Sequence, residues 1–301
     1  MRELHKYCSA TRHFGYDGVL ALPSTMTATP SPLPALGAAT LLRALFKRPR
    51  RLNGVPAPRT VYVLDGIDPH QLRRYRQALG FRDEGIPLTY YYLLAQRAHV
   101  ATMLDRAFPF RLPGTVHTEN ALHALADPRR DLPLVLATHV TIRPPAENGA
   151  VVAELDTVAR QDGIDIFTCR STYLVMRGQR ASRRPRKDAK PLPVLGGWRL
   201  ARGAGRAYAR LSGDWNPIHL WTWSARLMGV KRPIIHGMHT LARACAELEG
   251  ACGRRILALE GRFRAPAPLG SDLVLGADLA AGSFAVGGAG RVVAEGRFRT
   301  A

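Results

Sequence analysis

The sequence has few cysteines, and their spacing gives no sign of a metal site. The four, Cys8, Cys169, Cys245 and Cys252, lack the close pairs that bind zinc. The ten histidines likewise show no zinc pattern such as His-Glu-x-x-His. We therefore expect free cysteines that pack as small apolar side chains in a reducing compartment, and no metal ion or other cofactor.

Long apolar runs are also missing, which argues against a transmembrane helix. The most apolar stretch near the N-terminus, residues 33–46, is interrupted by Arg43 and is followed by a basic cluster. That order is the reverse of a secretory signal. We expect a protein without a membrane span, with the cytoplasm as its default location.

Acidic residues are scarce: 23 Asp and Glu against 43 Lys and Arg give a net charge of +20. Such a balance commonly indicates nucleic-acid binding. However, the arginines are spread along the chain, and no helix-turn-helix, zinc finger or aromatic RNA-binding pattern is present. Nucleic acid is therefore not the expected partner. An anionic ligand or partner would explain the basic charge, as would a compositional bias of the genome.

The length of 301 residues suits two domains, and two pairs of similar segments indicate a diverged duplication. Residues 75–80 resemble residues 208–213, and residues 140–149 resemble residues 261–270, in the same order. We expect an N-terminal extension, two similar domains and a basic linker between them. The expected boundaries are 1–55, 56–178 and 196–301, with the linker at 179–195.

Alternating apolar residues and turn signals predict a mixture of strands and helices. The N-terminal extension is expected to be partly disordered, with one short basic helix over residues 35–51. In the first domain we expect strands over residues 60–66, 134–143, 151–160 and 164–176, and helices over 96–107 and 117–126. In the second we expect a helix over residues 238–248, strands over 255–264, 272–280 and 291–299, and a turn over 282–290.

The most informative stretch is residues 212–219, which places Asp214 and His219 five residues apart on a shaped loop. Gly213 and Pro217 break regular structure there, and Asn216 before the proline favours an extended backbone. A carboxylate and an imidazole together can transfer protons near neutral pH. The same residues are also good turn formers, so the pair alone leaves a merely structural loop open.

Seventeen residues after His219 comes His236, followed by Gly237 and Met238 at the start of an apolar helical pattern. The first N–H groups of a helix have no partner within the helix, and its N-terminus favours negative charge. A glycine at that point would allow a ligand to approach the backbone closely.

Residues 208–219, 225–229 and 233–238 together resemble the hydratase motif of the MaoC-like family, which includes R-specific enoyl-CoA hydratases and 3-hydroxyacyl-thioester dehydratases. The resemblance covers about residues 57–301. It implies an α+β double hotdog, in which two antiparallel sheets each wrap around a central helix. One departure is Leu220-Trp221-Thr222-Trp223, where many relatives have an acidic residue shortly after the histidine.

The resemblance implies a catalytic role for Asp214 and His219, which would hold one water, with Asn216 orienting one of them or the water. It assigns stabilisation of the enolate oxygen to the N–H of Gly237. Three more residues are implied to bind substrate: Ser212, His236 and Met238. The implied substrate is a thioester of coenzyme A or acyl carrier protein, whose negative charge suits a basic protein.

The first domain has Gly80-Phe81-Arg82-Asp83-Glu84 where the second has the motif, and no histidine follows at the matching place. We therefore expect the first domain to have no catalytic residues. Its apolar run over residues 86–94 would either line an acyl tunnel or pack in the core. The resemblance further implies a pseudo-dimer of two hotdogs within one chain, with a homodimer of chains as an additional possibility.

Two other functions fit the same sequence. A hotdog acyl-CoA thioesterase would share the fold and ligand but would direct water at the carbonyl carbon. A non-catalytic acyl-thioester-binding or regulatory protein would need no Asp–His pair. The spacing of Asp214, Asn216 and His219 favours the hydratase over both.

Overall fold

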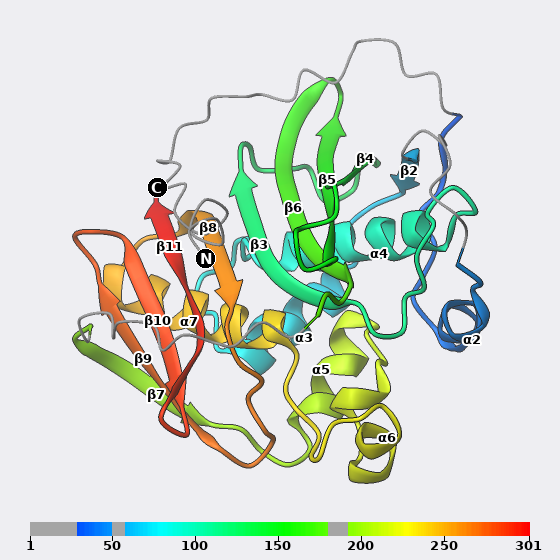
Figure 1. Ribbon diagram of the computed structural model, residues 1–301. Helices are drawn as coiled ribbons and strands as arrows, with labels where there is room; N and C mark the ends of the chain where they lie inside the picture. Colours follow the sequence, from blue (N-terminus) through cyan, green and yellow to red (C-terminus); the bar gives the residue numbers. More distant parts are fainter. Residues whose placement is uncertain (1–28, 50–57, 180–191) are drawn as a thin grey trace.

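The computed structural model describes residues 29–49, 58–179 and 192–301 (Figure 1). Much of the expected N-terminal extension and most of the expected linker lie outside the described residues. The part of the linker that is described differs from the expectation, because strand β7 begins at Val194. The backbone N–H of Ala277 donates to the carbonyl of Pro193, so residues just before β7 already pair with the second half of the chain.

The described strands form one eleven-stranded sheet in the order β1-β2-β4-β5-β6-β3-β8-β11-β10-β9-β7. The strands of the first half are β1 (Ser31–Pro32), β2 (Arg59–Leu64), β3 (Val116–Ala124), β4 (Leu134–Ile142), β5 (Val151–Gln161) and β6 (Ile164–Met176). Those of the second half are β7 (Val194–Arg199), β8 (Ile256–Phe263), β9 (Asp272–Asp278), β10 (Ser283–Gly288) and β11 (Arg291–Thr300).

The helices are divided between the same two halves. The first half contains α2 (Ala38–Phe46), α3 (Pro69–Leu79) and α4 (Tyr90–Leu104). The second contains α5 (Ala204–Ser212), the 3₁₀ turn η1 (Pro217–His219), α6 (Thr222–Leu227) and α7 (Gly237–Cys252). None of the helices in the described ranges is long and apolar enough to cross a membrane.

The two halves repeat one topology around a pseudo-two-fold axis. Apart from the two-residue β1 at the outer edge, the first half runs β2-β4-β5-β6-β3 and the second runs β7-β9-β10-β11-β8, so each of these strands has a counterpart. Strands β3 and β8 pair antiparallel at the centre, with Ala121 opposite Glu260. Long helices α4 and α7 lie on the same side of the sheet (Figure 1). Each half is thus a five-stranded sheet around one helix, as expected for a double hotdog.

The first expected repeat matches this symmetry, and the second does not. Residues 75–80 and 208–213 end helices α3 and α5, each with a left-handed glycine, Gly80 at φ 81° and Gly213 at φ 76°. Residues 140–149 follow β4, whereas residues 261–270 follow β8. These strands are not counterparts, because β8 corresponds to β3. Residues 140–149 and 261–270 are therefore similar only because each contains the end of a strand and the turn after it.

Two local predictions were wrong because strand pairing overrides sequence preference. Residues 117–126, expected as a helix, form strand β3, which is hydrogen-bonded to β6 on one side and β8 on the other. Residues 282–290, expected as a turn, contain strand β10. The side chains of Phe284 and Val286 in this strand are buried in the core, and glycines occupy the end of the strand. Helices α3 and α5 and strand β7 were not anticipated.

One hydrophobic core spans both halves. Helix α4 buries residues on nearly every side, as does α7 with its small residues. The same core cluster contains Tyr75 and Leu93 of the first half and Leu241 and Phe284 of the second. The two halves therefore share one main core, and the first half has a second, smaller cluster that includes Phe108 and Leu155.

The segment before α2 packs on β2 and α4, and its Leu36 lies against Gly213 at the end of α5. The N–H of Leu33 donates to the carbonyl of Val63, and Arg97 donates to the carbonyls of Leu33 and Pro34. Leu36 packs so closely on Gly213 that an added Cβ there would lie 2.8 Å from the Leu36 Cβ. The expected short helix is present as α2, and the segment before it covers the motif loop.

Candidate active site

The loop over residues 212–219 is fixed by its own hydrogen bonds. The Ser212 hydroxyl donates to the Tyr208 carbonyl and accepts from the Asp214 N–H at 3.2 Å. The Asn216 side chain accepts from the Ile218 N–H at 3.3 Å and so caps η1, where Pro217 takes the first position. This is the turn chemistry that the sequence predicts, and it determines where Asp214 and His219 point.

Each carboxylate oxygen of Asp214 accepts one hydrogen bond. The backbone N–H of Asn216 donates to Oδ1 and the side chain of Gln96 to Oδ2, both at 3.1 Å. Burial raises the pKa of Asp214, but His236, His219 and these two donors outweigh it and hold the pKa below its ordinary value. Asp214 is therefore ionised at neutral pH.

His219 is buried, with 8% of its surface exposed, and its ring is oriented by the backbone. Its Nδ1 lies 2.8 Å from the Ile234 carbonyl oxygen, which can only accept, so Nδ1 carries the proton and Nε2 a lone pair. Burial, followed by the neighbouring His236, lowers the pKa of His219 to about 3. At neutral pH the ring is uncharged.

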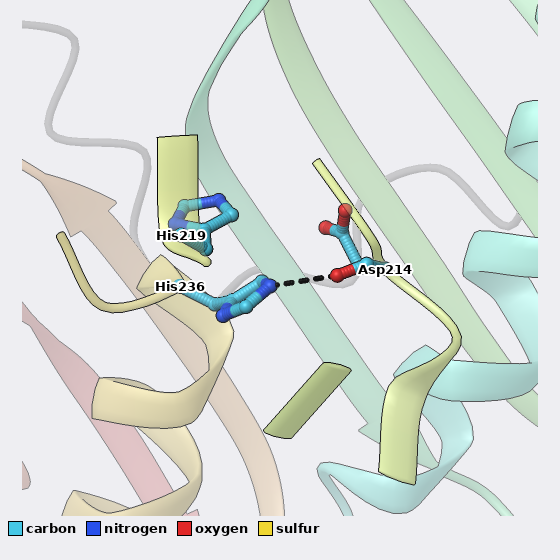
Figure 2. A group of neighbouring side chains, drawn as sticks. All are labelled: Asp214, His219 and His236. Carbon is cyan, nitrogen blue, oxygen red and sulfur yellow. Dashed lines mark hydrogen bonds between the residues drawn. The ribbon is translucent and has the colours of Figure 1, made fainter. Parts of the chain in front are cut away.

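His236 contacts both Asp214 and His219 (Figure 2). Its Nε2–H donates to the backbone carbonyl of Asp214 at 3.0 Å, and its ring stacks on His219 with centroids 3.7 Å apart. Burial lowers the pKa of His236 as well, because a charge on either stacked ring would lack solvation. The two imidazoles thus stay neutral beside one carboxylate.

Gly237 is the first residue of α7, directly after His236 as N-cap. The helix itself offers no acceptor for its N–H. A Cβ at this position would lie 2.7 Å from the Phe263 ring, so only glycine fits without displacing that ring. The backbone amide of Gly237 thus belongs to the N-terminus of α7, directly after one of the stacked histidines.

Comparison with known proteins assigns this chain to a family. A family model described as a MaoC like domain matches residues 179–280. The chain is also 31% identical over 203 residues to 3-hydroxyacyl-thioester dehydratase X of Mycobacterium tuberculosis, a match covering 64% of this chain and 70% of that protein. The chain belongs to the MaoC-like dehydratase family.

Solved structures show the same fold for this MaoC-like chain. HtdX of Mycobacterium tuberculosis matches with a TM-score of 0.66 at 22% identity, covering 80% of this chain and all of that one. A second M. tuberculosis protein, described as a double hotdog, matches with a TM-score of 0.52 at 14% identity, covering 79% and 94%. These likenesses confirm the α+β double-hotdog prediction.

The structure brings most of the predicted site residues of the MaoC-like motif together, with some differences in what they contact. Ser212 is engaged within the loop and Met238 is buried in the core cluster. Asn216 contacts Asp214 through its backbone N–H rather than its side chain. Asp214, His219 and His236 remain as the side chains that meet, and Gly237 follows His236 directly in the chain.

Gln96 was missed, although its partner Asp214 was predicted. It lies on α4 in the half expected to contribute only shape, 118 residues from the carboxylate that it contacts. The run over residues 86–94 just before it is mainly buried core, with Tyr90 and Tyr91 fully enclosed. An uncharged polar residue in such an apolar helix was the signal that could have indicated a buried partner.

The side chains of Asp214, His219 and His236 offer atoms within 4.8 Å of one another. Each histidine donates one ring N–H to a backbone carbonyl and keeps one lone pair on its other ring nitrogen. With the Asp214 carboxylate, these groups can accept hydrogen bonds from a water.

Proposed function

We propose that the chain catalyses the reversible addition of water to a trans-2-enoyl thioester of coenzyme A or acyl carrier protein, giving a (3R)-3-hydroxyacyl thioester. The single observation that carries the proposal is the meeting of Asp214, His219 and His236, whose side-chain atoms lie within 4.8 Å of one another, directly before the helix N-terminus at Gly237. The name of the M. tuberculosis relative, a 3-hydroxyacyl-thioester dehydratase, supports the same class of substrate.

The protonation states of the pair suit a bound water. The carboxylate of Asp214 and the Nε2 of His219 are both acceptors, so a water between them donates one hydrogen to each. The water oxygen then keeps a lone pair for the substrate. As it bonds to C3 of the enoyl group, one of the two acceptors takes a proton from the water, and a proton is delivered to C2.

Charge moves to the thioester oxygen as the C2=C3 electron pair shifts. The N–H of Gly237 would donate to that oxygen, and the N-terminus of α7 favours its negative charge. When C2 is protonated, the electron pair on the enolate forms the new C–H bond, the thioester C=O is restored and the product is complete. In the dehydration direction the same groups act in reverse, with one acceptor removing the C2 proton.

The test is hydration of crotonyl-CoA by purified protein, followed as loss of the enoyl absorbance. Asp214→Asn and His219→Ala should each lower kcat by about 10²–10⁴-fold with an unchanged circular dichroism spectrum. Asp83→Asn is the matched control, because Asp83 lies on the corresponding loop of the other half, where it accepts from the Gly85 N–H and lies 3.9 Å from Arg255 Nε. Near-wild-type turnover by either site variant would remove that residue from the mechanism.

A free-thiol assay in the same experiment separates the hydratase from a hotdog thioesterase. Hydration leaves the thioester intact, so no thiol is released. Thiol release without loss of the enoyl double bond would show that the site directs water at the carbonyl carbon instead. Acyl-thioester binding without either reaction would favour the non-catalytic function.

A further inference from the structure

The candidate site is completed by a side chain from the other half. Gln96 is 6% exposed and projects from α4, whose neighbouring residues Ala95 and Ala98 are fully buried. Its Nε2 donates to Asp214 Oδ2, while the Asn216 N–H donates to Oδ1. The carboxylate is thus held by one donor from its own loop and one from across the interface between halves.

The amide of Gln96 has no other hydrogen-bonding task within the described residues. Its Oε1 is buried there without a partner, so nothing but Asp214 specifies a polar side chain at this position. An ionised carboxylate can only accept, which fixes the NH₂ group toward Asp214. An apolar residue would satisfy the packing of α4 alone. The polarity of Gln96 is therefore explained by its bond to Asp214.

The pseudo-symmetry shows what the corresponding position on α7 does, where it faces the half without the motif. Gln96 is the seventh residue of α4, and the seventh residue of α7 is Arg243. Arg243 likewise reaches the loop of the opposite half, donating to the Leu79 carbonyl beside Gly80. An arginine at 96 would neutralise Asp214, whereas glutamine orients it and leaves its charge available. Glutamine on α4 therefore leaves the charge of Asp214 available, whereas arginine on α7 faces the half without the motif.

Other titratable groups face Asp214 from several elements, and they are uncharged at neutral pH. Tyr208 on α5, Tyr92 on α4 and Tyr173 on β6 have pKa values raised by burial. His117 on β3 has its pKa lowered by burial to about 4. Gln96 is the group from the first half that donates directly to the carboxylate.

We propose that Gln96 is a positioning residue for Asp214, supplied by the half that has no catalytic motif. It fixes the carboxylate against the bound water and keeps it ionised. This inference rests on the hydratase function proposed above. It also explains why the second half needs the first: the site is incomplete without α4.

The first test replaces Gln96 by leucine. Gln96→Leu should lower kcat for crotonyl-CoA by about 10–100-fold with KM nearly unchanged, because the carboxylate loses its orientation but substrate contacts remain. The acid limb of the kcat profile should also move to higher pH, since burial then favours the protonated acid. Unchanged kcat and an unchanged acid limb in folded Gln96→Leu would overturn the proposal.

A second variant gives a signature that a packing role cannot produce. In Gln96→Glu, a protonated carboxyl can still donate to ionised Asp214, but two ionised carboxylates would repel each other. Activity should therefore be retained at acidic pH and lost as pH rises, the opposite slope to Gln96→Leu. A Gln96→Glu profile parallel to that of the wild type would count against the bond.

Arg243→Met is the matched control, because it removes the corresponding side chain from the other half. It should change the melting temperature by an amount similar to Gln96→Leu while leaving the acid limb in place.

Should Gln96→Leu be too unstable to assay, NMR titration of the Asp214 carboxyl in Gln96→Glu still reports the coupling. Inactive wild-type protein would instead refute the hydratase function, and the NMR titration would then decide the Gln96–Asp214 bond independently.

Discussion

At the residue scale, the charge states of the candidate site at neutral pH are set by burial and by neighbouring side chains. His219 and His236 stack on each other away from water, so neither gains by taking a proton. Asp214 is partly buried but keeps its charge, because donors and neighbouring rings compensate the lost solvation. A carboxylate and an uncharged imidazole are thus available together at neutral pH.

This predicts a flat pH profile. The active forms are ionised Asp214 and neutral His219, and both pKa values lie below their ordinary positions, with that of His219 at about 3. Falling pH should therefore leave kcat/KM for crotonyl-CoA nearly unchanged between about pH 8 and 5.5. Short assays at each pH, started from stock protein at neutral pH, check this. An inflection near 6.5 would mean that His219 titrates as an exposed histidine.

At the element scale, the contact that matters most is the pairing of β3 with β8. It joins two five-stranded sheets into one and brings α4 within reach of the loop after α5. Leu122 on β3 lies opposite Leu259 on β8, and both are fully buried at this junction. The junction therefore belongs to the common core rather than to a mobile domain boundary.

Truncating this pair should destabilise the whole chain. Leu122→Ala should lower the free energy of unfolding by about 2–5 kcal/mol, through lost burial and the cavity left behind. Urea denaturation should remain a single transition, since one core serves both halves. Val116→Ala is the control on the same strand, because Val116 is 38% exposed and should change stability far less. Two separate transitions in Leu122→Ala would show that the halves fold independently.

At the scale of the whole molecule, buried histidines should make stability depend on pH. The pKa is lowered by burial to about 3 for His99 and His219 and to about 4 for His117 and His239. In the unfolded chain these rings return toward 6.5 and bind protons that the folded state excludes. Stability from these groups is therefore present above about pH 6.5 and lost as pH falls below it.

The melting temperature should accordingly drop steeply from pH 7 to pH 5. Each such histidine contributes up to about 1.4 kcal/mol per pH unit in this window. His99→Gln keeps a hydrogen-bonding group opposite Thr157, the partner of His99 Nε2, and should reduce the slope. Differential scanning calorimetry at several pH values measures it. A melting temperature independent of pH would contradict the neutral state of these rings.

The charge of the molecule should affect how fast an anionic substrate arrives. The chain carries +20, and residues 215–246, which contain both site histidines, include no Asp or Glu. Three exposed cations, Arg226, Lys231 and Arg232, lie in the segment between them. These charges would attract the phosphates of coenzyme A over a range that salt shortens.

Raising the salt from low ionic strength to about 0.5 M should therefore reduce kcat/KM for crotonyl-CoA several-fold and leave kcat unchanged. The combined variant Arg226→Ala, Lys231→Ala and Arg232→Ala should flatten this dependence. Replacing the exposed Arg73 of α3 by alanine serves as a control for net charge elsewhere. A kcat/KM insensitive to salt would show that the basic charge has no part in substrate capture.

The sequence by itself determined the motif loop, the turn chemistry that shapes it and the helix that starts at Gly237. These features depend on residues close together in the chain, where Gly213, Pro217 and Asn216 restrict the backbone directly. The tertiary structure decided that residues 116–124 form a strand, that β10 exists and that Gln96 meets Asp214. Those outcomes depend on contacts with other segments: β10 pairs with β9 and β11, β3 pairs with β6 and β8, and Gln96 lies 118 residues from Asp214. No local pattern contains the energy of such contacts.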